Sequence, residues 1–193
     1  MVQKTFYNYI KIEFSYKGRY KMKYELLRCG VDINRDPIQE ILVTRGIPCM
    51  EIPNYLYTTD ADITPPEMLS NIVEGARLLL SYIDKNEKAL LIVDSDCDGL
   101  TSSAVLTNFL YDLFPTWTEH NLYFFFHEGK QHGLEDVPIE ADDFKDIHLV
   151  ICPDAGSNDY EKHKYFKSLN KEILIIDHHE AEYESKDAIV INN

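Results

Sequence analysis

The feature that most constrains the fold is a series of short apolar runs that alternate with helical segments. Residues 89–94 form a continuous apolar run that ends in an aspartate, and such runs are typical of strands buried on both faces. Strands alternating with helices indicate βαβ units and a parallel sheet. The sequence therefore predicts an α/β fold with a mostly parallel sheet flanked by helices. The other expected strands are residues 122–126, 147–152, 173–176 and 188–191.

Three helices are expected around these strands. Apolar residues recur at three- and four-residue intervals over residues 65–86, and the two prolines at the start of this segment can open a helix. A second helix is expected over residues 101–114, ending before Pro115, and a third over residues 158–169.

Acidic clusters follow three of the expected strands. In an open α/β sheet, ligands bind beyond the carboxyl ends of the strands, so these clusters should converge on one rim. The clusters are Asp94, Asp96 and Asp98; Asp154; and Asp177, His178 and His179.

Crowded carboxylates repel one another, and a cation bound between them offsets this repulsion. A divalent metal site is therefore the simplest interpretation. Asp154 and a neutral imidazole from His178 or His179 would complete a mixed oxygen and nitrogen shell. Such a shell suits Mn²⁺ or Mg²⁺, and the imidazole favours Mn²⁺. Zinc is disfavoured because no cysteine joins the set.

Three other interpretations fit the first cluster less well. Asp and Gly after a strand can simply form a turn and cap a helix, but three clusters at three strand ends disfavour this. A calcium loop has a similar opening, yet Val105 stands where its bidentate Glu should be. A haloacid-dehalogenase-type phosphatase would need Thr at Leu100 and leaves residues 177–179 unexplained.

The three clusters resemble, in order and spacing, the first three motifs of the DHH phosphoesterases, and in particular of phage-type RecJ-like exonucleases. The motifs are Asp94-Ser-Asp96-Cys-Asp98-Gly99, Asp154-Ala-Gly156 and Asp177-His178-His179-Glu180. The resemblance implies a two-lobed enzyme in which this DHH lobe holds most of a binuclear Mn²⁺ or Mg²⁺ site. A second, DHHA1-type lobe would close on the nucleic acid. No part of this chain matches the fourth motif or that lobe, so the resemblance implies a DHH domain truncated before it.

The resemblance also assigns roles to individual residues. His179 would face the scissile phosphate, and Asp177 would orient an imidazole. The loop at residues 127–134 resembles the family's loop that approaches substrate, with a flexible connection as the alternative. Apart from the resemblance, the serine pair at residues 102–103 lies near a helix start beside the carboxylates, where it would contact phosphate or cap the helix, and capping is the favoured interpretation. The expected site comprises the metal ligands Asp94, Asp96, Asp98, Asp154 and His178, the catalytic residues His179 and Asp177, and the substrate-binding residues Ser102, Ser103, His132 and Gly133.

The implied function is metal-assisted, 5′-to-3′ hydrolysis of single-stranded DNA or an oligonucleotide. Two alternatives stay open: a DHH phosphodiesterase of oligoribonucleotides or cyclic dinucleotides, and a non-catalytic assembly module of the same fold. Intact, mutually repelling carboxylates favour an enzyme. We expect residues 1–21 to form an extension or hairpin and residues 22–193 the incomplete DHH domain.

Charge and cysteine content limit the setting. With 19 basic and 33 acidic residues the net charge is −14, which counts against tight DNA binding by this chain alone. The four cysteines form no C-x-x-C pair, no secretory signal is recognisable, and no apolar run approaches the ~20 residues that span a bilayer. We therefore expect no membrane role and a cytoplasmic location, in the host cytoplasm if a phage encodes the protein.

Overall fold

The computed structural model describes residues 36–192, and the chain divides into two compact units between Ile63 and Thr64. In the first unit, Asp36 caps a short helix by accepting a hydrogen bond of 3.0 Å from the Ile38 N–H. The expected hairpin and the expected boundary at residue 21 lie outside the described residues. The described elements of this unit are α1 (Pro37–Thr44), α2 (Ile52–Leu56) and the 3₁₀ turn η1 (Asp60–Asp62).

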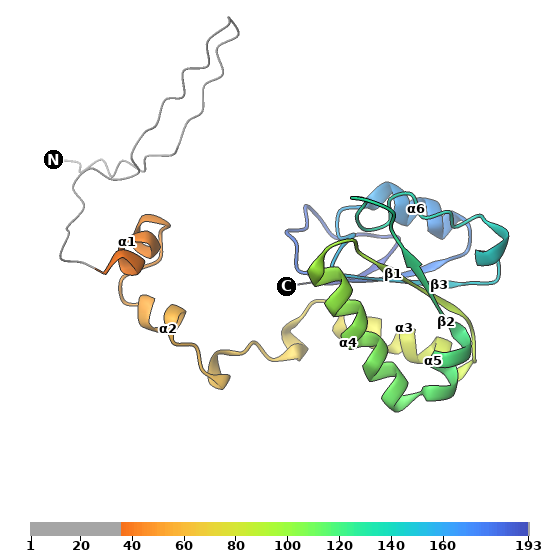
Figure 1. Ribbon diagram of the computed structural model, residues 1–193, viewed down its shortest axis with the longest axis horizontal. Helices are drawn as coiled ribbons and strands as arrows, with labels where there is room; N and C mark the ends of the chain where they lie inside the picture. The colour runs from red at the N-terminus through yellow and green to blue at the C-terminus, as the bar shows by residue number, and fades with distance from the viewer. Residues whose placement is uncertain (1–35, 193) are drawn as a thin grey trace, which may run out of the picture. The chain divides into compact units, whose positions relative to one another are not determined.

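The second unit is built on a five-stranded parallel sheet with the strand order β2-β1-β3-β4-β5 (Figure 1). Every residue of β1 and β3 is buried, as their continuous apolar runs predict for central strands. The predicted mostly parallel α/β fold is confirmed. The strands are β1 (Ala89–Val93), β2 (Leu122–Phe126), β3 (Leu149–Pro153), β4 (Glu172–Ile176) and β5 (Ile189–Ile191).

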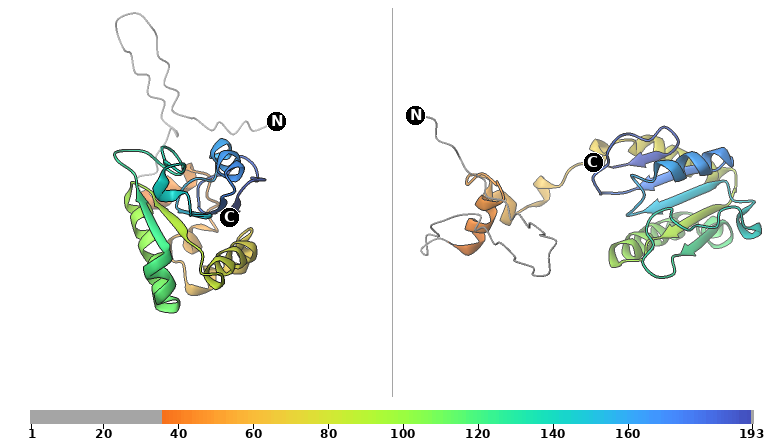
Figure 2. Two further views of the ribbon diagram at one scale, coloured as in Figure 1. Left: turned by 90° about the vertical axis from the view of Figure 1, so that its right-hand side faces the viewer. Right: turned by 90° about the horizontal axis from the view of Figure 1, so that it is seen from above.

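Helices cover both faces of this sheet (Figure 2). Side chains of three helices pack with Leu91 and Ile151 on one face, while Phe166 of α6 packs with Leu90 and Val150 on the other. None of the helices within residues 36–192 is long and apolar enough to span a bilayer. The helices are α3 (Ile72–Asp84), α4 (Cys97–Leu113), α5 (Pro115–Asn121) and α6 (Tyr160–Ser168), with 3₁₀ turns η2 (Pro66–Met68) and η3 (Asp142–Phe144).

Two helices begin at residues other than those expected. The helix expected from Pro65 begins at Ile72, because Asn71 has a φ of 59° and separates it from η2. The helix expected from Thr101 begins at Cys97, because the Asp96 side chain caps it by accepting a hydrogen bond from a backbone N–H in its first turn. The candidate acidic residues after β1 are thus tied to the start of α4.

Candidate metal centre

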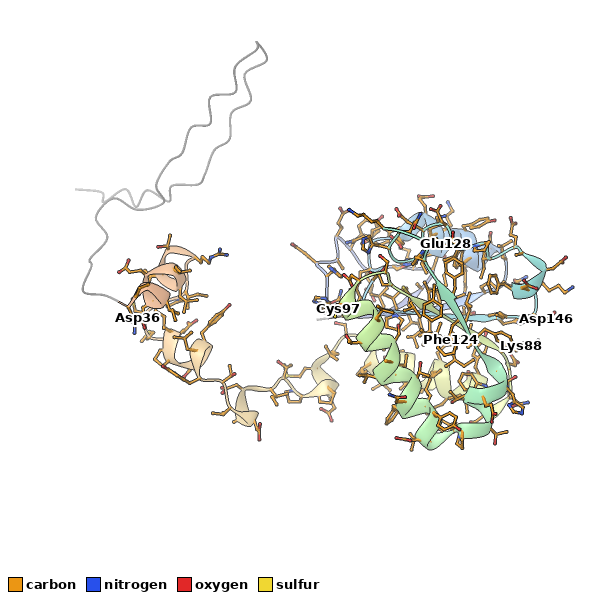
Figure 3. All side chains as sticks on the ribbon, in the orientation of Figure 1. Asp36, Lys88, Cys97, Phe124, Glu128 and Asp146 are labelled. Carbon is orange, nitrogen blue, oxygen red and sulfur yellow. The ribbon has the colours of Figure 1, made fainter. Side chains whose placement is uncertain are left out.

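The acidic clusters lie at the carboxyl ends of three adjacent strands. Asp94 follows β1, Asp154 follows β3 and Asp177 follows β4. Figure 3 shows Cys97, inside the first cluster, at the opposite end of the sheet from Lys88, which precedes β1. The structure therefore brings the three clusters to one rim, which we call the acidic rim.

Three carboxylates form the centre of the acidic rim. One oxygen each from Asp94, Asp96 and Asp154 lie within 4.8 Å of one another. Asp94 and Asp154 are buried and Asp96 is exposed. Burial raises the pKa of the Asp154 carboxyl, and the charges of Asp96 and Asp98 raise it further against the opposing effect of His178. A cation bound between these groups would remove that cost.

The loop after β2 holds Asp94. The Gly133 N–H donates to Asp94 Oδ1 at 3.0 Å, and His132 Nδ1 lies 2.9 Å from Asp94 Oδ2. The hydrogen bond between the His132 imidazole and the Asp94 carboxylate is the main cause of the raised pKa of His132. His132 and Gly133, two of the four residues expected to bind substrate, therefore contact a candidate metal ligand in this structure, and their role toward substrate stays a prediction.

The first turn of α4 packs directly on the end of β1. A Cβ on Gly99 would lie 2.4 Å from the Asp94 Cβ, so only glycine fits there without a shift. Asp98 is exposed in the same turn. Ser102 donates to the Gly99 carbonyl at 3.1 Å, whereas the hydroxyl of Ser103 is buried with no partner among the described residues. Burial speaks against direct contact between Ser103 and a substrate.

The third cluster is organised around the Asp177 carboxylate, whose side chain is 1% exposed. Its Oδ2 accepts from the Ser157 N–H at 3.0 Å, and its Oδ1 lies 2.7 Å from His179 Nδ1. Burial raises the pKa of Asp177, but the hydrogen bonds from Ser157 and His179 outweigh it and hold that pKa below its usual value. The hydrogen bond to Asp177 raises the pKa of His179. Because Nδ1 is engaged, Nε2 is the nitrogen that His179 can offer to a ligand.

His178 joins this cluster to the carboxylates, since its Nε2 lies 3.2 Å from Asp154 Oδ1. Asp154 has a φ of 69°, a left-handed conformation that Asp tolerates better than most residues. Its N–H donates to the Ile176 carbonyl at 2.7 Å, and the Asp177 N–H donates to Ile191 at 3.0 Å. Backbone hydrogen bonds thus tie the ends of β3, β4 and β5 together.

An open groove of about 630 Å³ begins at the acidic rim and continues along α4. Asp98 and Asp154 line it at the rim, and Val105 and Phe109 line it along the helix. Most of its wall is therefore apolar, although it starts at charged groups.

Sequence reasoning missed the residues that support the acidic rim from the start of α6 and from the end of the chain. Asp159 accepts a hydrogen bond of 2.8 Å from the Leu134 N–H, and Asn192 donates to Ser157 and His179. The partners of Asn192 are 13 and 35 residues away from it and form no motif with it. The position of Asp159 at the start of the helix expected over residues 158–169 was the one signal in the sequence that could have pointed to it.

Residues 88–193, more than half of the chain, match the model of the DHH family, N-terminal domain. The candidate SPbeta prophage-derived single-strand DNA-specific exonuclease YorK of Bacillus subtilis (strain 168) is 36% identical over 175 residues, which cover 89% of this chain and 28% of YorK. The single-stranded-DNA-specific exonuclease RecJ of the same organism is 28% identical over 155 residues, covering 80% of this chain and 19% of RecJ. The chain thus spans less than a third of either relative.

Two solved structures have a similar fold. RecJ from Thermus thermophilus in complex with Mn²⁺ superposes with a TM-score of 0.53 at 20% identity, covering 78% of this chain and 20% of that one. An exonuclease RecJ bound to manganese has a TM-score of 0.54 at 21% identity, with coverage of 67% and 33%. These matches agree with the parallel α/β fold described above. The chain belongs to the DHH family, and its residues 88–193 are the part that matches the family's N-terminal domain.

Proposed function

We propose that this chain provides the metal-binding lobe of a RecJ-type exonuclease that hydrolyses single-stranded DNA in the 5′-to-3′ direction. The observation that carries the proposal is the approach of Asp94, Asp96 and Asp154 to within 4.8 Å, with His178 3.2 Å from Asp154. The names of YorK and RecJ describe single-strand DNA-specific exonucleases, which supports this substrate.

The donor set fits Mn²⁺ or Mg²⁺, because carboxylate oxygens dominate it and an imidazole joins them. Manganese in two RecJ structures of the same fold supports Mn²⁺. When bound, two such ions would polarise the phosphoryl oxygens and lower the pKa of a bound water. The proposed ligands are Asp94, Asp96, Asp98, Asp154 and His178.

His179 is proposed to face the scissile phosphate. Its raised pKa favours the protonated imidazole, and Asp177 holds Nδ1, so the Nε2–H can donate to a phosphate oxygen. A donor aimed at an oxygen that gains negative charge stabilises the transition state more than the ground state. We therefore propose that the pair formed by His179 and Asp177 acts mainly on turnover.

The groove along α4 supports a place for the substrate. Its apolar wall at Val105 and Phe109 suits the flat face of a nucleobase whose phosphate lies at the acidic rim. Because the chain carries a net charge of −14, we propose that a second lobe, corresponding to the remaining length of YorK and RecJ, supplies the cationic contacts to a longer strand.

The groove also favours a second candidate, a phosphodiesterase of oligoribonucleotides or cyclic dinucleotides. A substrate of two or a few nucleotides carries few phosphates, so it needs no extended basic surface. The groove at the rim would hold such a substrate within this lobe.

The test compares the chain alone with the same chain joined to the part of YorK that lies outside the matched 28%. Mn²⁺ binding is measured by calorimetry, and hydrolysis is measured on end-labelled single-stranded DNA, a short oligoribonucleotide and a cyclic dinucleotide. We expect the chain to bind Mn²⁺, Asp96→Asn to weaken binding, and the fusion to degrade DNA. Hydrolysis of the short substrates without DNA degradation would establish the second candidate. Absence of Mn²⁺ binding would refute both.

A further inference from the structure

We propose that Asp159 and His163, at the start of α6, are positioning residues that hold the loops of the acidic rim at the spacing its ions require. The inference rests on the proposed function, because it assumes that the rim binds metal. Both residues act through the loops that carry the candidate ligands.

Asp159 joins the loop after β2 to the turn after β3. Its Oδ2 accepts a hydrogen bond of 2.8 Å from the Leu134 N–H, and the preceding residue, Gly133, donates its own N–H to Asp94 Oδ1 at 3.0 Å. The Asp159 N–H donates to the Gly156 carbonyl at 3.1 Å, two residues after the candidate ligand Asp154. One residue therefore connects the segments that support two of the buried carboxylates.

The two segments meet with no spare room beside Asp159. A Cβ on Gly133 would lie 2.5 Å from Asp159 Oδ2 and 3.3 Å from the Gly156 Cα. Both glycines have positive φ values, 58° and 99°, which few other residues adopt. The two backbones therefore pass close to each other beside the Asp159 carboxylate. Because this carboxylate accepts from the Leu134 N–H, its removal should loosen the loop after β2 from the turn after β3.

His163 makes the equivalent connection to the loop after β4. The residue is fully buried, with Nε2 3.0 Å from the Gly156 carbonyl and Nδ1 3.0 Å from Ser185 Oγ. A carbonyl can only accept, so Nε2 carries the proton. In the neutral imidazole, which burial favours by lowering the pKa of His163, Nδ1 then accepts from the Ser185 hydroxyl. Ser185 Oγ then accepts from the Ala188 N–H at 3.2 Å. Through His163, the loop that follows His178 and His179 is thereby linked to the Gly156 carbonyl, which belongs to the turn after Asp154.

A residue needed only for folding would behave differently from these two. Phe166, on the same helix, is fully buried in the core and secures α6 against the sheet by apolar contact. Asp159 and His163 instead direct polar atoms at the rim loops. Partners that orient metal ligands from outside the coordination shell typically change metal affinity by about 10- to 100-fold.

The test measures Mn²⁺ affinity of the full chain by calorimetry, well below the melting temperature of each variant. We expect Asp159→Ala to weaken binding by about 10- to 100-fold. Asp159→Asn keeps a carbonyl oxygen that can accept from Leu134, so it should restore most of the affinity. The matched control Glu161→Ala removes an exposed carboxylate from the same helix and should leave affinity unchanged.

A second control separates positioning from stability. Phe166→Leu should lower the melting temperature without changing Mn²⁺ affinity, whereas His163→Gln, which keeps a donor for the Gly156 carbonyl, should bind Mn²⁺ more tightly than His163→Ala. Hydrogen exchange of the Leu134 amide, measured without metal, should be faster in Asp159→Ala.

Three results would overturn the positioning role while leaving the proposed function intact: unchanged Mn²⁺ affinity in Asp159→Ala, an equal loss of affinity in Phe166→Leu, or unchanged exchange at Leu134. A wild-type chain that binds no Mn²⁺ would instead refute the proposed function, and the positioning of ions with it.

Discussion

Replacing Gly99 by alanine perturbs the contact between α4 and the end of β1. The new Cβ would lie 2.4 Å from the Asp94 Cβ and 2.9 Å from both the Cα and the carbonyl oxygen of Asp94. Two of these atoms belong to the backbone, so no change of rotamer relieves the overlap. The first turn of α4 has to move away from β1.

The expected cost follows from two opposing terms. Overpacking in a tightly packed site costs about 1–3 kcal/mol. Alanine is the better helix former and recovers up to about 1 kcal/mol. We therefore expect a net loss of about 1–2 kcal/mol in the free energy of unfolding. Because Asp96 caps α4 and Asp98 lies in its first turn, the same movement separates both carboxylates from Asp94, and Mn²⁺ affinity should fall.

The assay combines urea unfolding with calorimetric titration of Mn²⁺. Gly75→Ala is the matched control, because its Cβ would meet the flexible side-chain ends of Ile191 and Leu174 at 2.6 and 2.9 Å and neither the backbone nor a candidate metal ligand. The control should be less destabilised and should bind Mn²⁺ normally. If Gly99→Ala unfolds like the wild type and binds Mn²⁺ equally well, the close packing of α4 on Asp94 does not limit the site, and the reasoning is refuted.

Three further predictions concern charge at and near the acidic rim. Mn²⁺ at 100 times its dissociation constant should stabilise the fold by about 2.7 kcal/mol, seen as a raised melting temperature. The rise should be smaller when Mn²⁺ is added to Asp96→Asn, and smaller when Ca²⁺ replaces Mn²⁺ with the wild type. Asp177→Asn should lower the pKa of His179 in an NMR titration, because the charged partner that raises it is lost; an unchanged pKa would contradict this. Burial lowers the pKa of His163, so its contribution to stability is present above the unfolded pKa of 6.5 and lost as pH falls toward the folded one. Urea unfolding at pH 7.5 and pH 5 should therefore show a larger acid loss in the wild type than in His163→Gln.

The sheet could be predicted from the sequence because its central strands are buried on both faces. β1 and β3 then read as unbroken apolar runs, and the acidic residues follow them directly. The start of α3 could not be predicted in this way. The Ser70 N–H donates to the Asn192 carbonyl at 3.0 Å, and the Asn71 side chain donates to Val190 at 2.9 Å. These contacts with the end of the chain separate η2 from α3, and periodicity within residues 65–86 does not report them.

The carboxylates of the candidate site were accessible to sequence reasoning because each cluster directly follows a strand. Their supports were not. His132 reaches Asp94 across 38 residues, through a loop with no periodic pattern. Asp159 and Leu134 are 25 residues apart and interact through a backbone N–H, which any residue at position 134 other than proline could supply. Such contacts depend on how loops close, and the residue types involved carry little of that information.

The acidic rim is stabilised in a way that preserves its negative charge. Backbone N–H groups hold three of its carboxylates: Gly133 donates to Asp94, Gly99 to Asp96 and Ser157 to Asp177. Within residues 36–192, the side chains that form ion pairs with rim carboxylates are histidines. A lysine or arginine at the same distance would neutralise the carboxylates and compete with a divalent cation, whereas an N–H donor fixes their orientation and leaves their charge available. The carboxylates therefore still repel one another in the metal-free protein. A bound cation would relieve this repulsion, and the relief would contribute favourably to the free energy of binding.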